Sequence, residues 1–183
     1  DAERMSFEQK SSINLDLTKH PPRYFDGSLQ IASGRLRMLD RITGFERKGG
    51  REGLGWLRGE KEVDPSEWFF KAHFFQDPVQ PGSLGIEAIV QLLQFYMLHT
   101  DMDKPFRRPR FQSLGLGGKM IWKYRGQVIP SNQRIYTTMN IIERSTDIGN
   151  CRVVANASLW VDGRRIYEAK EISMRIIEEG STN

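Results

Sequence analysis

The longest apolar stretch of the chain lies between Ser83 and Leu98 and is interrupted by Glu87 and two glutamines. Its apolar residues recur at three- and four-residue steps, which is the period of an α-helix, and they also occupy the other helical faces. A helix that is apolar on nearly every side is stable only when the rest of the protein covers it. The sequence therefore predicts a buried central helix, capped by Ser83 and ending near Thr100.

Six other segments have the β-branched, aromatic and alternating pattern of strands. They are residues 35–47, 54–63, 110–124, 133–146, 151–161 and 164–177. Turn residues separate them, and the Asp162-Gly163 pair before the last segment is typical of a β-hairpin. The aromatic residues 68–75 are expected to be an extended run. One long helix with a mostly antiparallel sheet of about six strands predicts an α+β fold.

Length and composition indicate a single domain. We expect residues 1–33, which are polar and rich in turn residues, to form an extended arm with room for one short helix, and residues 34–179 to form the domain. The net charge of +4 is too small to favour nucleic acid. The single cysteine excludes a disulfide framework within one chain and favours a reducing, cytoplasmic location. No segment has the pattern of a membrane span.

Two residues with acid/base chemistry lie on either side of the Pro/Gly-rich loop that leads into the helix. His73 comes before the loop, and Glu87 lies inside the helix. A neutral imidazole can remove a proton near physiological pH, and a carboxylic acid can donate one. The N–H groups of Gly82 and Ser83 lie at the helix start, where they have no intrahelical acceptor and the helix dipole favours negative charge. A structural histidine or a glutamate paired with a buried arginine is an ordinary alternative for each residue alone, but their conjunction favours catalysis.

The sequence around this loop resembles the active-site motif of the hotdog-fold 3-hydroxyacyl-acyl-carrier-protein dehydratases, especially the 3-hydroxydecanoyl type. The residues that carry the resemblance are His73-Phe74, Asp77-Pro78-Val79, Pro81-Gly82, Leu84-Gly85, Ala88 and Gln91. It extends over roughly residues 35–177, through Met38-Leu39-Asp40-Arg41 upstream and Val161-Asp162-Gly163-Arg164 downstream. Residues 75–87 are most similar to the dehydratase domains of polyunsaturated fatty acid synthases, which are polyketide-type multidomain enzymes. A domain excised from such a protein would explain a chain that starts at Asp1.

The resemblance implies a single hotdog fold and a hydro-lyase that converts (3R)-hydroxyacyl thioesters into trans-2-enoyl thioesters in fatty acid biosynthesis. It implies that His73 is the base, that Glu87 is the acid, and that Gly82, beside Ser83, binds the thioester oxygen. In related enzymes the carbonyl corresponding to Val79 accepts a hydrogen bond from the histidine. The residue corresponding to Gln91 orients the carboxylate. The expected lining of the acyl tunnel is Phe74, Leu84, Ile86 and Phe95, and neither a metal nor an organic cofactor is expected.

The resemblance also implies two partners. One is an acyl carrier protein that presents the 3-hydroxyacyl chain on phosphopantetheine, and the basic residues 104–110 are expected to meet its acidic surface. The other is a second hotdog unit, as a homodimer or as a sister domain, with the histidine of one unit and the acid of the other in each site.

Two departures from the 3-hydroxydecanoyl type leave part of the function open. That type has Asp at the position of Glu87, so isomerisation from trans-2 to cis-3 is not implied as firmly as dehydration, and it has Cys at the position of Ser83. Two alternatives also stay open: a hotdog thioesterase, in which the helix carboxylate activates water, and a catalytically silent hotdog unit that pairs with an active one.

Overall fold

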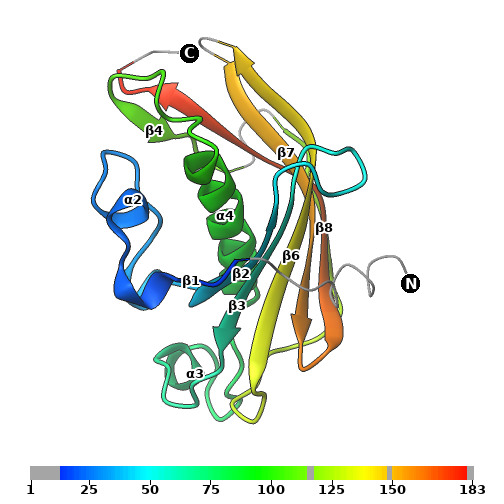
Figure 1. Ribbon diagram of the computed structural model, residues 1–183. Helices are drawn as coiled ribbons and strands as arrows, with labels where there is room; N and C mark the ends of the chain where they lie inside the picture. Colours follow the sequence, from blue (N-terminus) through cyan, green and yellow to red (C-terminus); the bar gives the residue numbers. More distant parts are fainter. Residues whose placement is uncertain (1–12, 115–117, 148–149, 181–183) are drawn as a thin grey trace.

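The structure is a computed structural model, which describes residues 13–114, 118–147 and 150–180. One long helix, α4 (Gly82–His99), lies against the inner face of a curved antiparallel sheet (Figure 1). The strand order is β1-β2-β3-β6-β7-β8-β4, and β5 also pairs with β8. The strands are β1 Leu15–Asp16, β2 Arg41–Glu46, β3 Trp56–Glu62, β4 Pro109–Phe111, β5 Ile121–Tyr124, β6 Arg134–Asp147, β7 Asn150–Val161 and β8 Arg164–Glu178. The short helical turns are η1 Leu17–Lys19, α2 Pro22–Phe25, η2 Gly34–Leu36 and α3 Phe69–Ala72.

The α+β fold with one long helix is therefore as predicted, but the described sheet has eight strands rather than about six. A two-residue strand, β1, precedes the predicted set, and the predicted strand 110–124 is divided into β4 and β5. The predicted first strand is also shorter, since β2 begins at Arg41. Before it, Gly34 adopts a left-handed φ of 60° and opens the turn η2.

The expectation of an extended run over residues 68–75 is wrong for its centre, where α3 forms a helical turn. Phe69 and Phe70 are neighbours in sequence, and both are buried. A strand would direct consecutive side chains to opposite faces. A helical turn allows both rings to enter the same core, which explains why the aromatic residues here do not follow the strand pattern.

The last two long strands, β7 and β8, form the predicted hairpin. Asp162 and Gly163 both have left-handed φ values, 48° and 83°, as the tight turn of a hairpin requires. The Asp162 carboxylate also accepts hydrogen bonds from the backbone N–H groups of Gln133 and Arg134, at 2.9 to 3.2 Å. This turn therefore holds the start of β6 against the end of β7.

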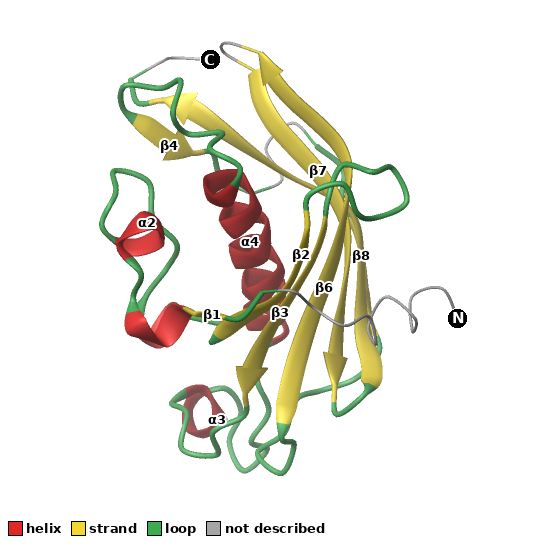
Figure 2. Cartoon of the chain, in the orientation of Figure 1, coloured by secondary structure: helices red, strands yellow, loops and turns green. Residues whose placement is uncertain are grey.

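The core lies between α4 and the sheet, and Ile89, Leu92 and Leu93 of the helix are fully buried there. The segment with α2 lies on the side of α4 away from the sheet (Figure 2). Its Tyr24 ring packs 5.1 Å from the Phe95 ring, measured between centroids. The described part of the predicted arm thus contributes to the same core as the rest of the chain, and the division at residue 33 stays a prediction.

Among the described residues, no helix has the length and apolarity needed to cross a membrane. The same residues contain no group of three or more His, Cys, Asp or Glu side chains arranged to hold a metal ion.

Candidate active site

His73 follows α3 directly and is held in one orientation by the loop after it. Its Nδ1 lies 3.1 Å from the carbonyl oxygen of Val79, the contact that the sequence resemblance implies. Because a carbonyl oxygen can only accept, Nδ1 carries the proton and a neutral ring presents Nε2 as its basic atom. The backbone is also fixed at both ends of the loop, since His73 N–H donates to Phe69 and Gln80 N–H donates to Val128.

Glu87 projects from the second turn of α4 and is oriented by Gln91, four residues later on the same helix face. Gln91 Nε2 donates to Glu87 Oε1 at 2.8 Å. Gln91 itself is completely buried, whereas Glu87 is half-buried and reaches the surface. The carboxyl group therefore combines access to a ligand with a fixed orientation.

The start of α4 has backbone N–H groups of the kind that favour negative charge. Gly82 and Ser83 are its first two residues, and the N–H groups of a first helical turn have no intrahelical acceptor. The prediction that Ser83 caps this helix is wrong, because Pro81 occupies the N-cap position and no side chain caps the helix. The fixed φ of Pro81, −53°, sets the direction in which the chain enters the helix. Ser83 is exposed within the first turn.

An aromatic wall that the sequence did not predict faces this helix start. It consists of Trp122 and Tyr124 of β5 and Tyr167 of β8, with ring centroids 5.0 to 5.9 Å apart. A Cβ added to Gly82 would lie 3.2 Å from both β5 rings, so the wall borders the proposed oxyanion donor. Burial raises the pKa of the Tyr167 hydroxyl above its usual range, so it stays protonated. The alternation Trp122-x-Tyr124 was the only signal for this wall in the sequence, and it does not reveal what the strand faces.

The four predicted tunnel residues lie in different environments. Phe74 is 54% exposed and its ring lies 4.0 Å from the His73 ring. Leu84 and Ile86 are buried in the first turns of α4. Phe95 is fully buried, and thirteen residues after Gly82 it lies roughly 20 Å along the helix axis. The contacts of Phe95 are those of a core residue, whereas the Phe74 ring adjoins the His73 ring.

Within the described residues no hydrogen bond joins His73 to Glu87. Each group has its own orienting partner, the Val79 carbonyl for one and the Gln91 amide for the other. An imidazole, a carboxyl group and unpaired backbone N–H groups are the types of group that proton transfer at an acyl thioester requires.

Residues 31–170 match the model of the FabA-like domain family. The chain belongs to this family. The FabA-like domain is also 35% identical over 141 residues to one of the subunits that make up the polyunsaturated fatty acid synthase of Thraustochytrium sp. (strain ATCC 26185 / S-3). The matched stretch is 77% of this chain but 9% of that relative, so the chain spans about a tenth of the relative's length.

Solved structures have the same fold. The dehydratase domain from the CurJ module of the curacin polyketide synthase aligns with a TM-score of 0.60 and 11% identity, over 95% of this chain and 53% of that one. The dehydratase heterocomplex ApeI:P from Xenorhabdus doucetiae aligns with a TM-score of 0.56 and 8% identity, over 81% of this chain and 88% of that one. At these identities the likeness shows the fold alone, and it is the hotdog fold that the sequence predicted.

Proposed function

We propose that the FabA-like domain is a (3R)-hydroxyacyl-acyl-carrier-protein dehydratase that forms trans-2-enoyl thioesters. The observation that carries the proposal is the hydrogen bond from His73 Nδ1 to the Val79 carbonyl, because it selects the tautomer in which a neutral ring presents Nε2 as its basic atom. Membership of the FabA-like family and the identity to part of a polyunsaturated fatty acid synthase support a hydro-lyase acting in fatty acid synthesis.

In this mechanism His73 Nε2 takes a proton from C2 of the substrate. The electron pair of that C–H bond forms the C2–C3 double bond as the C3–O bond breaks, and the Glu87 carboxyl group gives a proton to the departing hydroxyl, which leaves as water. Negative charge develops on the thioester oxygen during proton removal, and the Gly82 N–H group stabilises it. No metal or organic cofactor takes part in these steps.

The product of a 3-hydroxydecanoyl thioester distinguishes this function from its alternatives, because the hotdog fold alone does not separate them. A dehydratase releases the enoyl thioester with the loss of one water molecule, which mass spectrometry detects. Free acid and free thiol would instead identify a thioesterase. Unchanged substrate from a folded protein would identify a silent unit.

Isomerisation is a second step that Glu87 leaves open, since the 3-hydroxydecanoyl type carries the shorter Asp at this position. We propose that the enzyme dehydrates its substrate, and the proposal does not include the isomerisation step. Supplying trans-2-decenoyl thioester and separating the products by gas chromatography tests this directly. Accumulation of the cis-3 isomer would add isomerase activity to the assignment.

We propose that the site is completed by a second hotdog unit. Among the described residues strand β5 pairs with β8 alone, and all four of its residues, Ile121–Tyr124, are exposed although three of them are large and apolar. An unprotected apolar edge strand is suited to pairing with another chain. Among the described residues His73 and Glu87 share no hydrogen bond, which supports the same arrangement.

Mixing two inactive variants tests this pairing. When His73→Ala and Glu87→Gln chains are unfolded together and refolded, about half of the dimers are mixed and each mixed dimer has one intact site, so about a quarter of the original activity should return. No recovery, although mixed dimers are present by mass spectrometry, would place both residues of a site in one chain.

The proposed substrate carrier is an acyl carrier protein, and the basic residues 104–110 are the proposed contact. Two of these charges have partners within the chain, since Lys104 pairs with Asp101 at 3.2 Å and Arg108 pairs with Glu179. Reversing the charge of Arg107 and Arg108 should raise KM for a carrier-bound substrate more than KM for the same acyl chain on a small thiol. Equal effects on both substrates would remove the carrier contact from the proposal.

A further inference from the structure

The orientation of Glu87 is determined from outside its own helix. Gln91 Oε1 accepts a hydrogen bond from Met38 N–H at 2.8 Å, and Gln91 Nε2 donates to the Leu36 carbonyl at 2.6 Å. A backbone N–H can only donate and a carbonyl can only accept, so the side-chain amide has one possible orientation. Its remaining N–H therefore donates to Glu87 Oε1, and any proton on the Glu87 carboxyl group lies on Oε2.

Residues 35–38, which we call the anchor segment, also contact the part of the chain that leads to His73. The indole Nε1 of Trp68 donates to the Arg35 carbonyl at 3.2 Å. Trp68 directly precedes α3, and His73 directly follows it. The anchor segment is thus hydrogen-bonded both to Trp68, five residues before His73, and to Gln91, which orients Glu87.

A buried lysine on β3 holds these two parts of the chain together. Lys61 has a side chain that is only 7% exposed, and its Nζ lies 2.9 Å from Glu67 and 3.8 Å from Asp40. Asp40 follows the anchor segment, and Glu67 precedes Trp68. A buried ammonium group is costly unless it is paired, and this one pairs with one carboxylate just after the anchor segment and with another just before Trp68.

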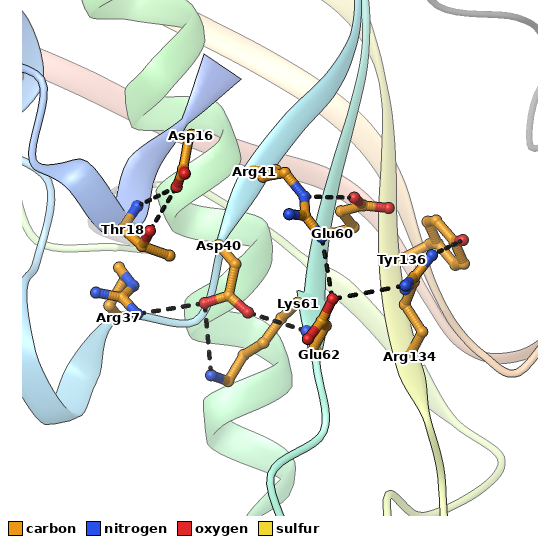
Figure 3. Close-up of polar contacts among 10 residues, drawn as sticks. All are labelled: Asp16, Thr18, Arg37, Asp40, Arg41, Glu60, Lys61, Glu62, Arg134 and Tyr136. Atoms are coloured by element: carbon orange, nitrogen blue, oxygen red, sulfur yellow. Dashed lines mark hydrogen bonds and ion pairs between the residues drawn. The ribbon is translucent and has the colours of Figure 1, made fainter. Parts of the chain in front are cut away.

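The anchor segment is fixed by further contacts of Asp40 (Figure 3). Its Oδ1 lies 3.4 Å from Arg37 Nη2, within the anchor segment, and its Oδ2 accepts a hydrogen bond from the Glu62 N–H at 2.9 Å. Asp40 N–H in turn donates to the carbonyl of Glu60 at 2.8 Å. Asp40, two residues after the anchor segment, is therefore attached to β3 through both side-chain and backbone bonds.

We propose that Lys61 and Trp68 are positioning residues, which act through the anchor segment to hold the Glu87 carboxyl group in a fixed relation to the loop that carries His73. This inference rests on the proposed function, because positioning matters for turnover only if His73 and Glu87 carry out the proton transfers. Neither residue touches the reacting atoms. Removing the contacts of Lys61 or Trp68 should therefore slow the chemical step while substrate binding is retained.

The test compares Lys61→Met and Trp68→Phe with the unchanged protein in steady-state assays of dehydration. Methionine keeps most of the volume of lysine without its charge, and phenylalanine keeps an aromatic ring without the indole N–H. A displacement of about 1 Å in a catalytic group is enough to reduce turnover by as much as about a hundredfold, so we expect kcat to fall about tenfold or more in each variant. KM should stay within about twofold, since substrate contacts are unchanged.

A matched control and two further variants separate positioning from stability. Arg41→Met removes two ion pairs of the neighbouring strand, with Glu60 at 2.9 Å and with Glu62 at 3.1 Å (Figure 3). Neither partner belongs to the anchor segment or is Trp68. This variant should keep its kcat. Lys61→Arg retains a cation and should recover most of the kcat that Lys61→Met loses. The double variant of Lys61→Met and Trp68→Phe should lose less than the product of the two single losses, because both act on one segment.

The inference is contradicted if kcat is retained in Trp68→Phe, which alters a partly exposed side chain and should fold, or if the losses appear only in KM. It is equally contradicted if Arg41→Met loses as much kcat as Lys61→Met. A failure of the proposed function would give a different result. His73→Ala or Glu87→Gln would then keep full turnover, whatever the effect of the Lys61 and Trp68 variants.

Discussion

The contact between Gly85 and Tyr167 gives a sharp prediction about stability. A Cβ added to Gly85 would lie 2.1 Å from Tyr167 Cε2 and 2.8 Å from Cζ, well inside any normal van der Waals contact. The ring is buried and packs against the rings of Trp122 and Tyr124, at 5.5 and 5.0 Å between centroids, so relieving an overlap this deep would have to displace them as well. We therefore expect Gly85→Ala to lower the free energy of unfolding.

Two effects of opposite sign set the magnitude. Alanine is favoured over glycine inside a helix by about 1 kcal/mol. Overpacking a core costs about 1 to 3 kcal/mol, and the depth of this overlap places it at or above the upper end of that range. The net loss should be about 2 kcal/mol, which lowers the melting temperature by roughly 4 to 8 °C for a domain of this size.

Urea denaturation of Gly85→Ala, followed by circular dichroism, measures this loss. Gly82→Ala is the control, because its Cβ would lie 3.2 Å from the ends of two partly exposed rings that can move aside. Its free energy of unfolding should change by no more than about 0.5 kcal/mol. Gly85→Ala should also cost less in a Tyr167→Leu background than alone. A Gly85→Ala variant as stable as the original protein would refute the reasoning.

Two further variants test the buried contacts of α4. Gln91→Leu leaves the Met38 N–H and the Leu36 carbonyl without their partner, so the free energy of unfolding should fall by about 2 kcal/mol or more in urea titrations; an unchanged midpoint would show that water replaces these bonds. Burial lowers the pKa of His99 below its ordinary value of 6.5, so the folded state binds fewer protons than the unfolded state just below that pH. The free energy of unfolding should therefore fall as the pH falls from 6.5, and His99→Gln should reduce this dependence; the same slope in both proteins would assign it to other groups.

The sequence predicted those parts of the fold and the site that depend on residues close together in the chain. The apolar period of residues 83–100 and the Asp162-Gly163 pair each act locally, and the structure has α4 and the β7–β8 hairpin there. The contacts of the site that were expected are also short-range, six residues from His73 to Val79 and four from Glu87 to Gln91. The resemblance to dehydratases supplied their meaning.

The contacts that could not be predicted join residues far apart in the chain. Gln91 meets Leu36 and Met38 across more than fifty positions, and Tyr167 closes on Gly85 across more than eighty. These contacts depend on the strand register and on the way β8 crosses the start of α4. No local sequence pattern predicts either feature. Lys61 is the clearest case, since a lysine in an alternating strand indicates an exposed face, yet its ammonium group is buried between two carboxylates.

The turnover of 3-hydroxydecanoyl thioester by His73→Ala and Glu87→Gln tests the central claim most directly. Both variants should remain folded by circular dichroism and bind the thioester. Their rate of water loss should fall by a factor of about 10² to 10⁴, which is the usual contribution of a general acid or base. Enoyl product formed at the original rate by either variant would contradict the mechanism.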